Sequence, residues 1–175
     1  MSELRRRMKF MNNSSEFLAE IEHEAASTGR LLERIPAGRL DWRPHPKSMS
    51  LGQLGMHVAT IPSRYAEIIA NDAIEVADLV NHVGCDSLEE LRQAWALNLA
   101  SVREQIRQAA VAPDSNWSVA RDGKPLLTLP KATARRLLML NHWYHHRGQL
   151  TVYLRLLDIP VPSVYGPSAD ENPFA

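Results

Sequence analysis

The sequence predicts an all-α fold, an up-and-down four-helix bundle with a candidate small hairpin before the last helix. Four long segments repeat apolar residues at steps of three and four, which is the pattern of amphipathic helices. Capping residues, prolines and glycines mark the ends of these segments, and the connections between them are short or moderate in length. Helices of this kind pack side by side in a bundle. The 175 residues are expected to form one domain, 1–175.

The first helix is predicted over about Asn13 to Ile35, where apolar residues from Phe17 onward form one stripe. Pro36 and Gly38 follow it and stop the helix. Residues 1–12, which include a short run of arginines, are expected to form a loose N-terminal arm.

A capping box opens the second helix. In Ser50-Leu51-Gly52-Gln53, the serine side chain caps the backbone N–H three residues later, and the glutamine side chain reaches back. The helix is predicted from Ser50 to Asn71, with a kink near Thr60 because Pro62 lies inside it. Residues 72–86 are expected to be a connection.

A second capping box, Ser87-Leu88-Glu89-Glu90, opens the third helix, which is predicted to end near Ala110. Residues 112–130 contain Asp122-Gly123, a strong tight-turn signal, so a small hairpin is expected there. An irregular loop is the alternative, because Pro125 weakens the strand interpretation.

The last helix is predicted to be the longest, from Lys131 to about Asp158. After Pro160 the chain has three more prolines and no periodicity. Residues 159–175 are therefore expected to form an extended C-terminal tail that drapes over the surface.

Composition narrows the classes of function. Lys plus Arg and Asp plus Glu both number 20, and no basic patch with interleaved aromatic residues is present, so nucleic-acid binding is not expected. The single cysteine, Cys85, cannot form an intrachain disulfide or a thiolate metal site, which favours a reduced, cytoplasmic setting. No apolar run approaches the roughly 18 residues of a membrane span, and no secretory signal is expected.

Three of the seven histidines are placed to converge on one point. His142 and His146 are four residues apart, so on a helix they lie about 40° apart on one face, with Cβ atoms about 5–6 Å apart. That separation allows two imidazoles to bind one metal ion. His57 lies on the apolar face of the second helix, so two facing helices bring three imidazoles together.

A lone inward histidine is more often a hydrogen-bonded core residue than a metal ligand. Three converging histidines are harder to explain as packing, because each buried imidazole needs a polar partner and one ion supplies a partner to all three. One divalent ion per subunit is expected. Three neutral nitrogens leave coordination positions open, which is typical of catalytic sites, and zinc and nickel both suit imidazole.

Other polar residues have two open interpretations each. Gln149 shares the stripe of the histidines and is expected to contact a metal-bound water or substrate, or else a neighbouring helix. Glu24 is a candidate for contact with a metal ligand or substrate, or for a partner of Arg or Lys across the bundle. Arg147 faces away from the histidines, which favours a salt bridge or a clasp on the tail. Tyr165 either covers the pocket mouth or docks the tail, and His145 lies at the margin of the stripe.

The sequence resembles the DinB family, the DinB/YfiT-like metalloenzymes, from about residue 15 to 171. The resemblance rests on Leu54-Gly55-Met56-His57, on the run from His142 to Gln149, on Tyr153-Leu154-Arg155 and on the tail from Val161 to Ser168. The stretch DWRPHPKSMSLGQL, 41–54, is similar to the first loop of the same family.

This resemblance implies a four-helix bundle, usually dimeric, that holds a divalent metal, often zinc or nickel. The family's ligand pattern, one histidine on the second helix and a pair on the last, falls on His57, His142 and His146. His145 matches a histidine that the family pattern does not use as a ligand. Some relatives transfer or isomerise groups with low-molecular-weight thiols.

The leading prediction is therefore a cytoplasmic, homodimeric, metal-dependent enzyme that acts on a small molecule. In a thiol transferase the ion would lower the pKa of a thiol, and in a hydrolase it would bind hydroxide. No residue is assigned a catalytic role, because no general base stands out. The alternatives are a non-catalytic metal-binding or stress-response module, and a bundle whose histidines pack without metal.

Overall fold

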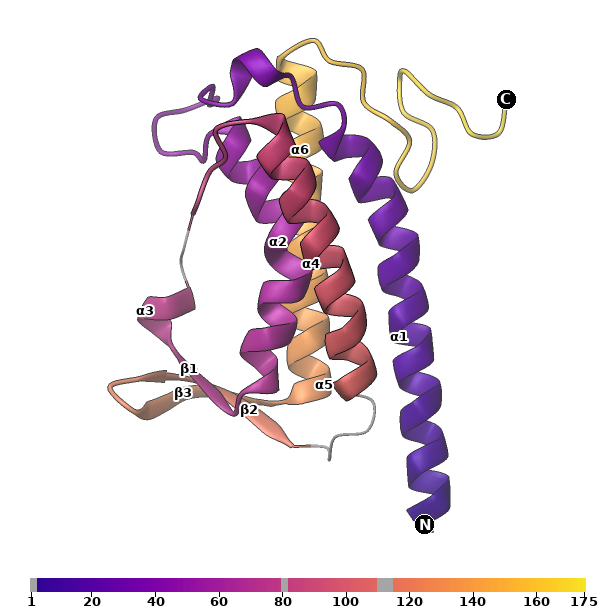
Figure 1. The fold of residues 1–175 in the computed structure, drawn as a ribbon, viewed down its shortest axis with the longest axis vertical. Helices are drawn as coiled ribbons and strands as arrows, with labels where there is room; N and C mark the ends of the chain where they lie inside the picture. Colours follow the sequence, from indigo (N-terminus) through magenta and orange to yellow (C-terminus); the bar gives the residue numbers. More distant parts are fainter. Residues whose placement is uncertain (1–2, 80–81, 110–114) are drawn as a thin grey trace.

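Long helices packed side by side form the body of the protein (Figure 1). The computed structural model describes residues 3–79, 82–109 and 115–175. The body consists of α1 (Glu3–Leu32), α2 (Leu51–Ala70), α4 (Leu88–Ala109) and α6 (Asn141–Leu156). Two shorter segments, α5 (Lys131–Ala134) and the π-helical turn η2 (Arg135–Leu140), lead directly into α6. The short helices η1 (Ala37–Arg39) and α3 (Val76–Leu79) lie in the connections. Because α2 contacts α1, α4 and α6, it is the central helix of the core.

The start of α1 corrects one prediction. The helix begins at Glu3 rather than near Asn13, so the segment 1–12, expected to be a loose arm, is helical from Glu3 onward. The physical reason is local. Leu, Arg, Met and Lys are good helix formers, and no proline or glycine interrupts the chain before Asn13.

The predicted capping box of α2 is confirmed. The Ser50 hydroxyl accepts from the Gln53 backbone N–H at 3.2 Å, and the Gln53 side chain accepts from the Ser50 N–H at 2.8 Å. The helix continues through Pro62 to Ala70. Since proline has no N–H, Pro62 leaves the carbonyl of Val58 without its usual helical donor.

A small sheet overturns the all-α prediction. In the described residues, β1 (Ala73–Glu75), β2 (Asn116–Arg121) and β3 (Lys124–Pro130) form a three-stranded mixed sheet in the order β1-β2-β3. The strands β2 and β3 are the expected hairpin, but β1 pairs in parallel with β2 and lies in the segment 72–86 that was expected to be a connection only. The fold is a helical bundle with an added mixed sheet at one end (Figure 1).

Side-chain contacts explain why such short strands pair. The Glu75 carboxylate accepts hydrogen bonds from the backbone N–H groups of Asp122 and Gly123, each at 3.0 Å, so β1 is tied to the tip of the hairpin. The φ angles of 52° and 72° at Asp122 and Gly123 are the positive values that a tight hairpin turn needs. Pro125 is tolerated because β3 is an edge strand.

The sheet is fixed to the bundle by Trp117 of β2. Its side chain is fully buried, and its indole N–H donates to the Ile68 carbonyl at 3.1 Å near the end of α2. At the opposite end of the bundle, the chain after Leu156 forms an extended tail beside the end of α1 (Figure 1). Within the described ranges, no helix is both long enough and apolar enough to span a bilayer.

Candidate metal centre

The structure brings together the three histidines that the helical spacing placed on facing surfaces. His57 extends from α2, and His142 and His146 extend from α6. One ring nitrogen of each lies within 4.8 Å of the others, and the Nε2 atoms of His57 and His142 are 3.3 Å apart. Two nitrogens bound to one tetrahedral zinc ion at about 2.0–2.1 Å would be about 3.3 Å apart. The donor set therefore fits a single divalent ion.

All three imidazoles favour their neutral form, which is the form that binds metal. Burial, together with the neighbouring imidazoles of His146 and His142, lowers the pKa of His57 to about 3. Burial and the nearby His146 lower the pKa of His142 to about 4. Burial also lowers the pKa of His146, although its hydrogen bond to Gln149 opposes the shift.

A contact made possible by Pro62 holds α6 against α2 at the level of this cluster. The Trp143 indole N–H donates at 3.0 Å to the Val58 carbonyl, the group that Pro62 leaves without a helical donor. Trp143 is fully buried and directly follows His142, while Val58 directly follows His57. The bond thus fixes the register of the two helices where their histidines meet.

The π-helical turn η2 directly precedes α6, and the last-helix prediction did not include it. A π turn has more residues per turn than an α-helix, so it changes the direction in which His142 points relative to Lys131. Short π turns are frequent at functional sites. The Leu138 backbone within η2 lies close enough to the His142 ring to oppose the lowering of its pKa. Nε2 of His142 faces Nε2 of His57, so it is the nitrogen placed for a shared metal ion.

Two residues near the cluster were missed by the sequence analysis. His82 lies edge-on to His57 with ring centroids 5.6 Å apart, and Tyr65 lies edge-on to His142 at 4.9 Å. Tyr65 is buried on α2, one position after Arg64, whose charge lowers the pKa of His57 and His142. The helical position of Tyr65 on α2 could have indicated that it lies near the cluster. His82 lies in a connection, where no periodic pattern indicates the position of a side chain.

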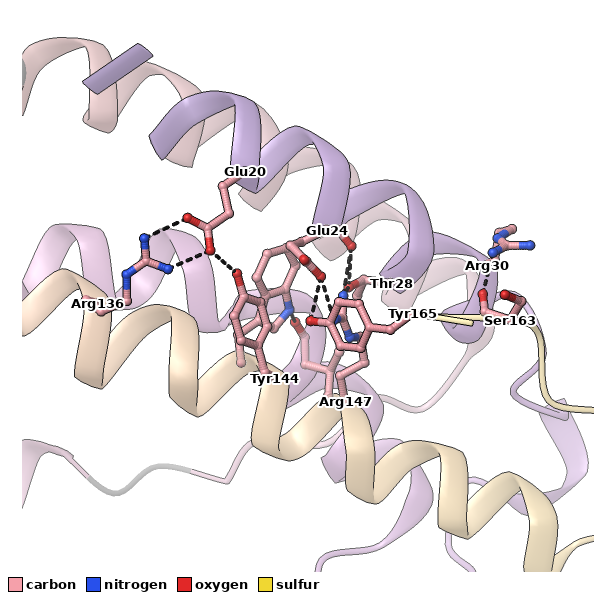
Figure 2. A network of polar contacts seen from close by, with 11 residues as sticks. Glu20, Glu24, Thr28, Arg30, Arg136, Tyr144, Arg147, Ser163 and Tyr165 are labelled. Atoms are coloured by element: carbon pink, nitrogen blue, oxygen red, sulfur yellow. Dashed lines mark hydrogen bonds and ion pairs between the residues drawn. The ribbon is translucent and has the colours of Figure 1, made fainter. Parts of the chain in front are cut away.

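The polar network of Figure 2 decides the open interpretations of Arg147, Glu24 and Tyr165. Arg147 is only 2% exposed and forms a salt bridge with Glu24 across the bundle, with Nη2 and Oε2 2.5 Å apart. Its Nη1 donates to the Glu24 carbonyl at 3.1 Å and to the Thr28 hydroxyl at 3.2 Å. The Tyr165 hydroxyl contacts Arg147 and donates to the Glu24 carboxylate at 3.0 Å.

The prediction of a salt bridge and tail clasp for Arg147 is therefore confirmed, and Tyr165 docks the tail. Glu24 is the partner of an arginine across the bundle, not a neighbour of the histidines. The same face carries a second group, in which Glu20 binds Arg136 through two bonds of 2.6 and 2.8 Å and accepts from the Tyr144 hydroxyl at 2.8 Å (Figure 2). Burial and the Glu20 hydrogen bond raise the pKa of Tyr144.

Gln149 contacts two histidines of its own helix. Its amide oxygen is 2.7 Å from Nδ1 of His146, and its amide nitrogen is 3.1 Å from Nε2 of His145. A hydrogen bond from Gln149 to a neighbouring helix was one alternative that the sequence allowed. That alternative is wrong, because both partners of Gln149 lie on its own helix. His145 is exposed and does not join the three-nitrogen cluster.

Cys85 is expected to react slowly with alkylating reagents in the folded protein. The side chain is buried, its thiol lies 3.7 Å from the Gly52 carbonyl, and burial, aided by the carboxylates of Glu90 and Asp86, raises its pKa. Little thiolate is then present at neutral pH. Mass spectrometry of iodoacetamide labelling over time would measure this, with urea-unfolded protein as the control. Equal labelling rates in the two states would contradict the prediction.

A helical bundle in which two helices present three converging neutral histidines belongs to the class of candidate metal-binding bundle proteins. Residues 8–172 match the model of a family described as the DinB family. The chain belongs to the DinB family, as its resemblance in sequence had indicated.

Two solved structures are similar in fold, and one curated protein is similar over a short stretch. A DinB-like protein from Bacillus cereus has a TM-score of 0.66 at 21% identity, covering 85% of this chain and 95% of the other. A DinB-like protein from Bacillus subtilis has a TM-score of 0.58 at 21% identity, covering 83% and 95%. The Bacillus subtilis protein YrdA, described as uncharacterized, is 43% identical over 35 residues, which span 20% of this chain and 21% of YrdA. The two structural matches show the shared fold.

Proposed function

We propose that this protein is a divalent-metal-dependent enzyme that acts on a small molecule. His57, His142 and His146 hold one ion per subunit, with zinc or nickel as the metal. The observation that carries the proposal is the convergence of three imidazoles whose lowered pKa values keep them neutral. The proposal of a homodimer rests on the family resemblance alone.

The chemistry of the donor set supports an open, reactive site over a closed, structural one. Three protein ligands are typical of catalytic zinc sites, whereas structural sites have four. A divalent ion held by neutral ligands supplies Lewis acidity that favours an anion such as a thiolate or hydroxide.

Two reactions fit this preference. In a thiol transferase, a low-molecular-weight thiol would be the nucleophile toward an electrophilic carbon. In a hydrolase, hydroxide would attack an activated ester or a similar bond. Of the two side chains that border the histidine cluster, Tyr65 is buried and His82 is exposed, so His82 is the one open to contact with either substrate.

Metal content and turnover test the proposal together. Mass spectrometry of the purified protein is expected to find about one zinc or nickel ion per subunit. The loaded protein is then assayed with thiol–electrophile pairs and with activated esters, and metal-free protein is the control. Turnover in only one panel identifies the reaction. If the protein takes up neither zinc nor nickel, the proposal fails.

The alternative is a non-catalytic module whose metal is structural, and chelation separates the two. The bundle has a large apolar core and the three histidines are only half-buried, so we expect the fold to form without an ion. Chelated protein is therefore expected to keep its helical circular dichroism and a cooperative thermal transition. Collapse of the fold on chelation would favour the structural module.

A further inference from the structure

The side chain of Gln149 connects the histidine cluster to an exposed histidine. Gln149 lies three residues after His146 and four after His145, so all three share one face of α6. The amide oxygen of Gln149 lies 2.7 Å from Nδ1 of His146, and its amide nitrogen lies 3.1 Å from Nε2 of His145.

The donor and acceptor roles in this chain of hydrogen bonds are fixed by the amide. A carbonyl oxygen can only accept, so Nδ1 of His146 carries the proton and donates to Gln149. An amide nitrogen can only donate, so Nε2 of His145 accepts and that ring carries its proton on Nδ1. His146 is consequently left with a lone pair on Nε2, the nitrogen that remains available to a metal ion.

The opposite arrangement is self-consistent but incompatible with metal. If the amide were turned around, its nitrogen would donate to Nδ1 of His146, and the ring proton would move to Nε2. That proton would then occupy the position where the nitrogens of His57 and His142 converge. An imidazole nitrogen that bears a proton has no lone pair for an ion.

We propose that Gln149 is a positioning residue that holds His146 in the tautomer competent for metal binding, and that its contact with His145 helps to keep the Gln149 side chain in place. The proposal rests on the metal site proposed above. It assigns a role to the exposed His145, which is outside the ligand cluster. A metal-binding histidine generally depends on such a partner at its other ring nitrogen.

Nuclear magnetic resonance of the imidazole nitrogens tests the tautomer directly. In metal-free, ¹⁵N-labelled protein, His146 is expected to carry its proton on Nδ1. Gln149→Leu removes the acceptor, so the proton is expected to shift toward Nε2. Gln149→Glu keeps an acceptor and is expected to restore the native tautomer, an outcome that a purely structural role for Gln149 would not produce.

Zinc affinity, measured by competition with a chromogenic chelator, is the second readout. Gln149→Leu is expected to raise the Kd by about 10- to 100-fold, the usual effect of losing such a partner. Gln149→Glu is expected to stay close to the native Kd, and His145→Ala to show a smaller increase than Gln149→Leu. Val152→Ala, an exposed position on the same helix, is the matched control.

The two readouts keep this inference separate from the proposed function. If Gln149→Leu leaves the His146 proton on Nδ1 and the Kd unchanged, the positioning role is wrong while the metal site stands. If the native protein binds no zinc or nickel, the proposed function fails, and the tautomer measurement still shows whether Gln149 controls the ring.

Discussion

Replacing His57 by alanine is expected to raise the Kd for zinc by roughly 100- to 1,000-fold, so that the purified variant carries almost no metal. Structural zinc sites with four ligands gain about 10–16 kcal/mol, which is about 2.5–4 kcal/mol per ligand. Each 1.4 kcal/mol corresponds to a tenfold change in Kd. His142→Ala and His146→Ala are expected to act similarly, because one nitrogen of each meets at the same point.

Two controls separate loss of a ligand from loss of the fold. His45→Ala removes an exposed histidine outside the cluster and is expected to leave metal content unchanged. Circular dichroism of His57→Ala should match that of the native protein, since His57 is only half-buried. Metal content by mass spectrometry is the readout. A His57→Ala protein that retains a full equivalent of metal would remove His57 from the site.

The convergence of the histidines was predictable because it depends mainly on helical phase. The four-residue spacing of His142 and His146 places them on one face of a helix, and His57 lies on the apolar face of α2, so packing of the two helices brings them together. The bond from Trp143 to Val58 that sets the register was not predictable, because it depends on which carbonyl Pro62 leaves open and on which partner lies across from it.

The errors in the fold have the same origin. The strand β1 is three residues long and carries no alternation of its own, and it becomes a strand because Glu75 and its backbone meet the hairpin. That contact joins segments far apart in the chain. His82 was missed for a related reason, since its approach to His57 depends on the path of a connection and not on a helical period.

The sequence left open which group the Glu24 carboxylate contacts, and the reason is different. Its place on the inner stripe of the first helix was clear, but a buried carboxylate can face either the histidine cluster or a cation. The structure places Arg147 opposite it and on the side of α6 away from the histidines, so the charge of Glu24 is compensated by Arg147 and not by a metal. The network of Glu24, Arg147 and Tyr165 therefore stabilises the fold and holds the C-terminal tail against the bundle.

Arg147→Met is expected to lower the free energy of unfolding by about 3–5 kcal/mol, the cost of leaving one member of a buried ion pair without its partner. Glu24 is only 6% exposed, so water cannot solvate its carboxylate fully once the guanidinium is gone. The substitution also removes the donors to Thr28 and the contact to Tyr165. A loss of this size is a large part of the 5–15 kcal/mol that holds a typical domain.

Urea denaturation of matched variants shows whether the unpaired charge is the cause. Tyr165→Phe keeps the ion pair and removes one hydroxyl, so it is expected to cost about 0.5–1.5 kcal/mol. The double variant Glu24→Gln with Arg147→Met removes both charges and is expected to be more stable than Arg147→Met alone, because no ion is left buried. Glu24→Gln alone is measured as well, and if the double variant loses the sum of what Glu24→Gln and Arg147→Met each cost, the two side chains do not act as a pair. The cost of Arg147→Met would then reflect lost packing against the rings of Trp143, Tyr144 and Tyr165.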